Sequence, residues 1–296
     1  MSYRIGVFGL GTMGIPISCN FLADGNQVMG YDPFPKAVEN MKAHGIQAAA
    51  SPRELMEHSD VVFSILPEVS MLAAMADGED GILAGCPQGS GKTIIDLTTS
   101  DPGDSVAFGN RMISNGVHYI DCGMTGGRVG AVERKLVMMA GGDKAVFDEY
   151  RPLLETIAKS ITYIGPLGCG HRMKLLHNAV SNSTFMAVIE TTVLGRMYGM
   201  DLQAMIDVFN VGNARSYATE VRFPKYIIPG TFDMGYKFQT GAKDFRMIMK
   251  IAERKNFHLE MSKITHDYYQ YGVDIGRAGD DVTQLYNLLE ERNTEH

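Results

Sequence analysis

The sequence of 296 residues predicts an α/β fold in which a doubly wound parallel sheet is followed by an all-α domain. Two observations predict it. From residue 1 to about residue 165, short β-type runs alternate with helical stretches, which is the element order of α/β folds. Past Gly165 the strand pattern largely disappears, and apolar residues follow helical spacing. We therefore expect an N-terminal domain at residues 1–165 and an all-helical domain at residues 166–296.

Most of the expected elements are short, but one long helix begins the second domain. Strands are expected at residues 3–8, 27–31, 60–65, 93–96, 118–122, 136–140 and 160–164, and C-terminal helices at residues 171–200, 202–210, 240–254 and 282–291. The helix over 171–200 is apolar on all sides, which predicts that it is buried between the domains. Ser51-Pro52-Arg53-Glu54 is a capping box with proline at the first helical position, and it predicts another helix start.

The first expected strand runs directly into a glycine-rich turn. Its residues are Gly9, Leu10, Gly11, Thr12, Met13 and Gly14. In a Rossmann-type turn of this spacing, the first glycine allows the tight turn, the second lets the backbone approach a pyrophosphate, and the third lets the helix pack on the sheet. The pyrophosphate lies on the N–H groups at the positive end of the following helix. The turn therefore predicts a dinucleotide-binding domain.

An acidic residue closes the second expected strand. Asp32 lies about 20 residues beyond the glycines, where a carboxylate accepts hydrogen bonds from an adenosine ribose. A carboxylate suits a free 2′-hydroxyl and repels a 2′-phosphate, and residues 33–35 include no arginine. We therefore expect NAD to be preferred over NADP, although Lys36 lies close enough to weaken this argument.

Composition limits the classes of partner. A net charge of −7 and a pI near 5.6 argue against nucleic acid or an anionic membrane surface as the main partner. The four cysteines are scattered without a Cys-x-x-Cys pair or a Cys/His cluster, so we expect no metal site and reduced thiols. No apolar run approaches the roughly 18 residues of a membrane-spanning helix. These features predict a cytoplasmic protein.

A lysine near the start of the long helix is a candidate for proton transfer. Lys174 is followed four residues later by Asn178, so both side chains project from one helix face. The helix dipole and partial burial both disfavour the charged amine and lower its pKa. Hydride transfer to or from a hydroxyl carbon needs such a proton donor and acceptor. Considered alone, however, the segment favours a lysine that extends from a helix to solvent.

A second candidate segment follows the strand expected at 118–122. Thr125, Gly126, Gly127 and Arg128 combine a hydroxyl, exposed backbone N–H groups and a guanidinium, all of which can bind a carboxylate. Ligands bind at the carboxyl ends of strands in such sheets. A glycine-rich stretch is equally often only a turn.

Taken together, these residues resemble the β-hydroxyacid dehydrogenases, a family that includes 3-hydroxyisobutyrate dehydrogenase and tartronate semialdehyde reductase and is related to 6-phosphogluconate dehydrogenase. The resemblance covers essentially the whole chain and its motifs occur in the family's order. The matching segments are Gly9 to Pro16 with Asn20, Leu66-Pro67, Thr98 to Pro102 with Thr99 among them, Thr125-Gly126-Gly127, Lys174 with Asn178, and Lys243-Asp244. The occurrence of these motifs in register favours a functional Lys174.

The resemblance implies an oxidoreductase that moves a hydride between a nicotinamide and a small β-hydroxy acid or its semialdehyde. In that case Lys174 is the general base in oxidation and the general acid in reduction. Asn178 and the segment Thr125–Arg128 would bind substrate. The cofactor would contact the glycine turn (Gly9, Leu10, Gly11, Thr12, Met13 and Gly14), Asp32, Leu66, Pro67, Thr99 and Lys243. The resemblance also implies a homodimer or homotetramer.

Departures from the family pattern leave the substrate open. Thr125 replaces a serine, Gly123-Met124 stands where relatives often have Pro-Val, and His177 replaces an asparagine. Arg128 is not expected in the motif, and Arg134 replaces a glycine. The added positive charge indicates a second anionic group on the substrate, such as a dicarboxylate or sulfonate; equally, both arginines could face solvent.

Three alternatives remain open from the sequence. The same scaffold could carry a reductase of another bond such as an imine, an oxidative decarboxylase, or a protein that binds a dinucleotide without catalysis. Retention of Lys174 argues against the last. Release of carbon dioxide, as opposed to NADH formation alone, would identify a decarboxylase.

Overall fold

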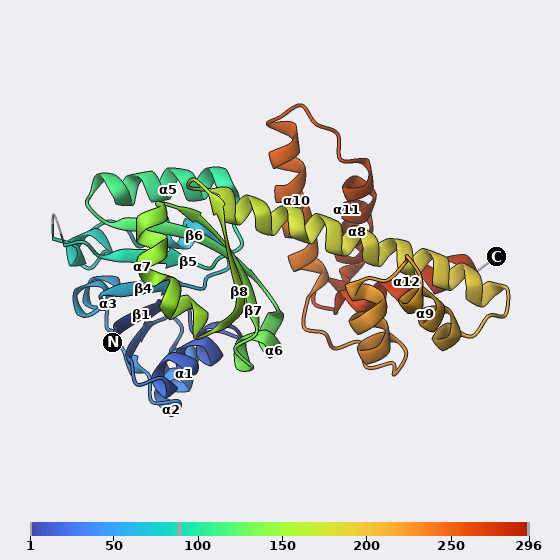
Figure 1. Cartoon of the computed structure of the whole chain (residues 1–296), viewed down its shortest axis with the longest axis horizontal. Coiled ribbons are helices and arrows are strands. Elements are labelled where there is room, and N and C mark those ends of the chain that lie inside the picture. The colour runs from blue at the N-terminus through green and yellow to red at the C-terminus, as the bar shows by residue number, and fades with distance from the viewer. Residues whose placement is uncertain (1, 88–89, 295–296) are drawn as a thin grey trace. The chain divides into compact units, whose positions relative to one another are not determined.

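A computed structural model describes residues 2–87 and 90–294 of the chain (Figure 1). Their contacts divide into two compact units, the first ending at Lys174 and the second beginning at Leu175. The first unit contains the sheet and the second is built of helices. The expected α/β fold with a following helical region is therefore confirmed. The assignment of residues 1–165 to a cofactor domain and of 166–296 to a substrate and oligomerisation domain stays a prediction.

The sheet of the first unit has eight strands in the order β3-β2-β1-β4-β5-β6-β7-β8. The strands are β1 (Arg4–Phe8), β2 (Gln27–Tyr31), β3 (Gln47–Ala48), β4 (Val61–Ser64), β5 (Thr93–Asp96), β6 (His118–Thr125), β7 (Leu136–Gly142) and β8 (Ala158–Gly165). Strands β1 to β6 run parallel, but β7 pairs antiparallel with β6 and parallel with β8. The expectation of a parallel sheet is thus corrected at β7 and β8, which both run opposite to the other six strands. The two-residue β3 was not expected because it has no apolar run.

Helices cover both faces of this sheet. They are α1 (Gly14–Ala23), α2 (Pro35–Ala43), α3 (Pro52–His58), α4 (Val69–Ala74), the 3₁₀ turn η1 (Leu83–Gly85), α5 (Pro102–Ser114), α6 (Gly127–Val132) and α7 (Lys144–Glu155). Alternate strand residues enter two separate cores: Phe63 packs with α1 and α7, whereas its neighbour Val62 packs with α3 and α5. The period of two along a strand produces this division. The predicted capping box also forms, because the Ser51 hydroxyl accepts a hydrogen bond from the Glu54 N–H.

The second unit packs around the remainder of one long helix, α8 (Cys169–Met197), which begins in the first unit. The other elements are α9 (Leu202–Val211), the π-helical η2 (Ala218–Ile227), α10 (Phe238–Glu253), α11 (Glu260–Gly272), the π-helical η3 (Val273–Arg277), the 3₁₀ turn η4 (Val282–Gln284) and α12 (Leu285–Thr294). Phe185 and Ile189 of α8 lie in the core of this unit. Leu176 and Val180 are exposed. The expectation that α8 is buried on all sides is therefore wrong. No helix among the described residues is long and apolar enough to cross a membrane.

Candidate active site

The three glycines of the first turn have different structural roles. Gly9 has a φ of +87°, and a Cβ there would lie 2.5 Å from the carbonyl oxygen of Ile65. A Cβ on Gly14 would overlap the carbonyl oxygen of Gly9. A Cβ on Gly11, by contrast, would meet no protein atom within 4 Å. Folding therefore requires Gly9 and Gly14, whereas Gly11 leaves space that fits a group bound from outside the protein.

The N-terminus of α1 and Asp32 complete this end of the sheet. The N-cap residue Met13 makes no side-chain capping bond, so no N-cap side chain occupies the start of α1, the position where a pyrophosphate binds in folds of this kind. Asp32 is half-buried and its two carboxylate oxygens accept hydrogen bonds from the N–H groups of Leu10 (3.1 Å) and Phe34 (3.0 Å). The carboxylate thus holds the glycine turn in place. Each oxygen has a further lone pair, so the residues present fit the ribose of a nicotinamide dinucleotide.

The loops after β4 and β5 are joined to each other. The N–H of Leu66 donates to the Thr98 hydroxyl at 3.3 Å, and the N–H of Val69 donates to the Ser100 hydroxyl at 2.8 Å. Thr98 and Ser100 are buried and hold the loops together, while Thr99 between them is half-buried and Pro67 is exposed. The predicted cofactor segments therefore follow β1, β2, β4 and β5, which are parallel. Their carboxyl ends meet at one edge of the sheet, where dinucleotides bind.

The next strand brings the predicted substrate loop to the same edge. Thr125 is the last residue of β6 and is half-buried. Gly126 and Gly127 follow with φ values of +121° and +59°, a region that favours glycine. Arg128, in the first turn of α6, is exposed. The structure therefore places all four predicted residues at the end of β6.

Arg134 has a different role from the one considered for it. Its guanidinium binds both carboxylate oxygens of Asp24 at 2.7 Å and donates to the carbonyl oxygens of Asn20 and Thr156. Its φ is +59°, which explains why a glycine suits this position in relatives. Arg134 therefore links elements within the first unit, and only Arg128 of the two arginines remains available to a ligand.

Lys174 is held against the backbone of β6. It is 9% exposed, and a Cβ on Gly123 would lie 2.5 Å from the Lys174 Cβ. A Cβ on Gly170 would overlap the carbonyl oxygen of Asp121. The two glycines thus let the first turns of α8 approach the strand that ends at Thr125. The departure at Gly123 noted in the sequence has this structural explanation.

A carboxylate begins the helix that carries Lys174. The oxygens of Asp121 accept hydrogen bonds from the N–H groups of Gly168 and His171, both at 2.7 Å. Burial raises the pKa of Asp121, while the nearby His171 and the two N–H donors act in the opposite direction. The His171 ring is itself buried and lies within hydrogen-bond distance of the Ser105 hydroxyl (2.8 Å) and the Asp96 carbonyl oxygen (3.1 Å). This network fixes the start of α8 and hence the position of Lys174.

Asn178, one turn further along α8, is oriented by side chains of the second unit. Its Nδ2 donates to Oδ2 of Asp244 at 2.9 Å, and the same oxygen accepts a hydrogen bond from the Tyr236 hydroxyl at 2.9 Å. Burial and the Asp244 carboxylate raise the pKa of Tyr236 well above its usual range, so the hydroxyl stays protonated and donates. Asn182 Nδ2 donates to the Asn178 carbonyl oxygen at 3.0 Å. The bond to Asp244 directs the Asn178 Oδ1 away from that carboxylate.

Several of these residues were missed from the sequence. Asp244 and Asn182 had usable signals, because Asp244 adjoins Lys243 in a quoted motif and Asn182 lies four residues beyond Asn178. Tyr236 had none. Lys243 lies half-buried on α10, and its contact with a cofactor stays a prediction.

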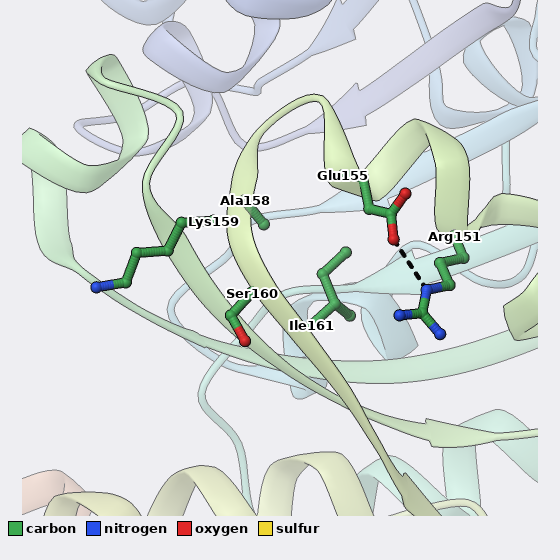
Figure 2. Close-up of a pocket in the computed structure, with 6 residues that line it drawn as sticks. All are labelled: Arg151, Glu155, Ala158, Lys159, Ser160 and Ile161. Atoms are coloured by element: carbon green, nitrogen blue, oxygen red, sulfur yellow. Dashed lines mark hydrogen bonds and ion pairs between the residues drawn. The ribbon is translucent and has the colours of Figure 1, made fainter.

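A pocket of 330 Å³ lies elsewhere on the first unit (Figure 2). It is lined by Arg151 and Glu155 of α7 and by Ala158, Lys159, Ser160 and Ile161 of β8. Arg151 and Glu155, one turn apart on α7, form an ion pair at 2.9 Å (Figure 2). None of the predicted site residues lines this pocket. Within the described parts of the chain, no group of three or more His, Cys, Asp or Glu side chains could hold a metal ion.

Two family models match the chain in succession. Residues 4–165 match the NAD binding domain of 6-phosphogluconate dehydrogenase, and residues 168–289 match the NAD-binding domain model of NADP-dependent 3-hydroxyisobutyrate dehydrogenase. With the glycine turn, these matches define a nicotinamide-dependent oxidoreductase.

Individual relatives agree along the full length. The 2-(hydroxymethyl)glutarate dehydrogenase of Eubacterium barkeri is 28% identical over 98% of this chain and 96% of its own length. The 2-hydroxy-3-oxopropionate reductase of Escherichia coli is 28% identical over 97% of both chains. A solved structure of Mycobacterium tuberculosis 3-hydroxyisobutyrate dehydrogenase with L-serine has a TM-score of 0.89 and 26% identity, covering 98% of this chain and 99% of that one.

The chain belongs to the β-hydroxyacid dehydrogenase family. It is an enzyme that transfers a hydride between a nicotinamide cofactor and small hydroxy acids.

Proposed function

We propose that the enzyme interconverts a small β-hydroxy acid and its semialdehyde, with Lys174 as general acid and base and with NAD preferred over NADP. The observation that carries the proposal is the placement of a buried lysine beside the strand that ends at Thr125. Lys174 is 9% exposed, so the residue is largely withdrawn from water. The same helix face presents Asn178 one turn later.

Each residue has a separate role in the oxidation. Lys174 accepts the proton of the substrate hydroxyl as the hydride leaves the same carbon, and it returns a proton to the oxygen in reduction. Asn178 is held by Asp244, and its Oδ1, which lies 3.3 Å from the His177 Nδ1, would accept a hydrogen bond from the substrate hydroxyl. Thr125, Gly126 and Gly127 offer a hydroxyl and N–H groups to the carboxylate. The nicotinamide, when bound, accepts or supplies the hydride.

The cofactor preference rests on Asp32 and its surroundings. Its carboxylate is fixed by two N–H donors at the ribose end of the glycine turn. A 2′-phosphate placed there would meet a negative charge without a compensating arginine in residues 33–35. This arrangement supports NAD as the preferred cofactor, with Gly9, Leu10, Gly11, Thr12, Met13, Gly14, Leu66, Pro67, Thr99 and Lys243 as its further contacts.

The cellular setting and assembly are also part of the proposal. All four cysteines are free thiols in the structure, which supports a reducing compartment, the cytoplasm. Exposed Leu176 and Val180 on α8 support contact with a second copy, in a homodimer or homotetramer. Light scattering coupled to size exclusion measures the mass, and a monomer at micromolar concentration would contradict the assembly.

The first experiment is NADH formation at alkaline pH. The substrates are 3-hydroxyisobutyrate, glycerate, threonate, serine, 2-(hydroxymethyl)glutarate and sulfolactate, with NADP⁺ in parallel and carbon dioxide release recorded. Turnover of one member with NAD⁺ and without carbon dioxide supports the proposal. If NADH binds but no member is oxidised, the β-hydroxy acid assignment fails, and a cyclic imine is then tested with NADH.

A further inference from the structure

A buried arginine in the second unit makes no direct ion pair within the part of the chain that the structure describes. Arg222 lies in the π-helical segment η2 (Ala218–Ile227) and is 5% exposed. Among the described residues, no carboxylate lies within 4.0 Å of its guanidinium, although surface arginines such as Arg4 and Arg53 do form such pairs. A buried cation is stable when an anion or several hydrogen bonds replace the water it has lost. π-Helical turns also occur frequently at functional sites.

Neutral groups satisfy only part of this guanidinium. Nη1 donates to Oδ1 of Asn182 at 3.1 Å and Nη2 donates to the Ser181 hydroxyl at 3.2 Å. Arg222 also makes a side-chain hydrogen bond with Tyr269. The Phe185 ring lies 4.5 Å and the Tyr217 ring 5.8 Å from its central carbon. The buried Nε has no hydrogen-bond partner among the described residues. A guanidinium has five N–H donors, and Nε is one corner of the fork that binds a carboxylate through two bonds.

The partners of Arg222 extend the polar face of α8 that carries the proposed substrate residues. Ser181 and Asn182 lie three and four residues beyond Asn178, on the same side of the helix. At 1.5 Å per residue this spacing is about 5 Å along the helix axis, the span of about four carbon–carbon bonds. Arg222 is therefore placed further along the helix face that starts with Lys174 and Asn178.

We infer that Arg222 recognises a second anionic group of the substrate, so that the substrate class is a β-hydroxy acid with a distal carboxylate or comparable anion about four bonds from the reacting carbon. The inference rests on the proposed function for the position of the reacting carbon. The distal anion would supply the missing counter-charge and the acceptor for Nε. Tyr217, which is exposed, marks the side of the guanidinium towards solvent.

A purely structural role for Arg222 predicts different behaviour. Arg222 is connected to the buried Asp244 carboxylate through Asn182 and Asn178. Burial raises the pKa of Tyr269, and of the two charges Arg222 lowers this pKa and Asp244 raises it. If Arg222 served only this network, its replacement would lower stability without changing the preference for dianionic ligands. The test therefore measures the preference itself.

The first test measures binding without turnover. Glutarate, a dianion, and its monomethyl ester, a monoanion of the same length, are titrated into the NADH-saturated enzyme and into the enzyme alone by calorimetry. We expect glutarate to bind the wild type about 10- to 100-fold more tightly, the range for a charge-assisted pair of hydrogen bonds. Arg222→Gln should remove this difference, and Arg222→Lys, which retains the charge without the fork, should reduce it.

Arg215→Gln is the matched control, because Arg215 lies just before η2 with its side chain 66% exposed. It should retain the preference for glutarate. Equal affinity of the wild type for the two ligands overturns the inference, as does a preference that survives in Arg222→Gln. If Arg222→Gln does not fold, Arg222→Lys and the wild-type comparison decide the question.

A kinetic test separates this inference from the proposed function. Arg222→Gln should lower kcat/KM for 2-(hydroxymethyl)glutarate about 10- to 100-fold more than it lowers kcat/KM for 3-hydroxyisobutyrate, and the difference should appear in KM. A wild type that oxidises monoanionic acids without favouring dianions leaves the function intact and overturns the anion site. If glutarate binding depends on Arg222 but no hydroxy acid is oxidised, the anion site stands and the dehydrogenase proposal fails.

Discussion

The glycine turn of the first unit and the polar face of α8 in the second unit prepare their binding groups by different means. In the turn, backbone conformation and close packing form the site. The fold requires Gly9 and Gly14, whereas Gly11 leaves space next to the backbone for a ligand. On α8, side chains hold one another, as Asp244 and Tyr236 do for Asn178. The comparison teaches that a backbone site depends on which residues lack a Cβ, whereas a side-chain site depends on distant partners.

The largest effect is expected at Lys174, near the start of α8. Replacing Lys174 by Met should reduce kcat about 10²- to 10⁴-fold, the usual contribution of a general acid and base. NADH affinity, followed by fluorescence, should change less than twofold because the glycine turn is untouched. Lys159→Met on β8 is the control. A folded Lys174→Met variant within tenfold of wild-type turnover would remove Lys174 from the mechanism.

Two alanine variants sharpen the difference among the glycines. Gly14→Ala forces a Cβ against the Gly9 carbonyl oxygen and should lower the free energy of unfolding by about 1–3 kcal/mol. Gly11→Ala should leave the melting temperature unchanged and weaken NADH binding about tenfold, because the methyl group occupies the open approach. Thermal unfolding and NADH titration measure both. A Gly11→Ala variant that is destabilised but binds NADH normally would show that this position serves packing.

The side-chain arrangement is tested at Asp244. Asp244→Asn removes the charge that orients the Asn178 amide and should lower kcat/KM about 10- to 100-fold, the range for hydrogen bonds to a charged group. Tyr236→Phe, which removes one donor to the same oxygen, should have a smaller effect. Asp267→Asn, an exposed carboxylate on α11, is the control. If Asp244→Asn retains wild-type kcat/KM, the orientation of Asn178 does not depend on this bond.

The smallest effect is expected at Asp32, where a side chain supports the backbone site. Asp32→Ala should raise the ratio of kcat/KM for NADP⁺ over NAD⁺ about tenfold, because repulsion of the 2′-phosphate is removed. Loss of the acceptor for the Leu10 and Phe34 N–H groups should also lower the free energy of unfolding by about 1 kcal/mol. Lys36→Ala is the companion variant. An unchanged ratio of kcat/KM for NADP⁺ over NAD⁺ in Asp32→Ala would contradict the proposed role of Asp32 in the preference for NAD.

Local features of the fold were predictable because their causes lie within a few residues. The bounds of β2 and β5 agree with the expected strands, and the Ser51 cap forms as its motif predicts. The reversed direction of β7 was not predictable, since an apolar run has the same pattern in a parallel and an antiparallel pair. The full burial expected for α8 was wrong because an apolar composition does not say which faces find partners.

In the candidate site, too, local features were predictable from the sequence and contacts between distant residues were not. The helical spacing of Lys174 and Asn178 was evident in the sequence, and so was the glycine turn. Arg134 was interpreted through its charge, but its partner Asp24 lies far away in the sequence and is brought to it by packing. Asp244 reaches Asn178 from another helix for the same reason. No local pattern encodes either contact.

The sequence by itself determined the α/β order of elements, the turn for a dinucleotide and the family resemblance, because glycine conformation and hydrophobic period act over short stretches of chain. The tertiary structure alone decided which glycines the fold requires, which arginine pairs within the protein, and which arginine is buried without a carboxylate. Those outcomes depend on side chains from separate elements meeting in a low-dielectric interior, where each polar group must find a partner.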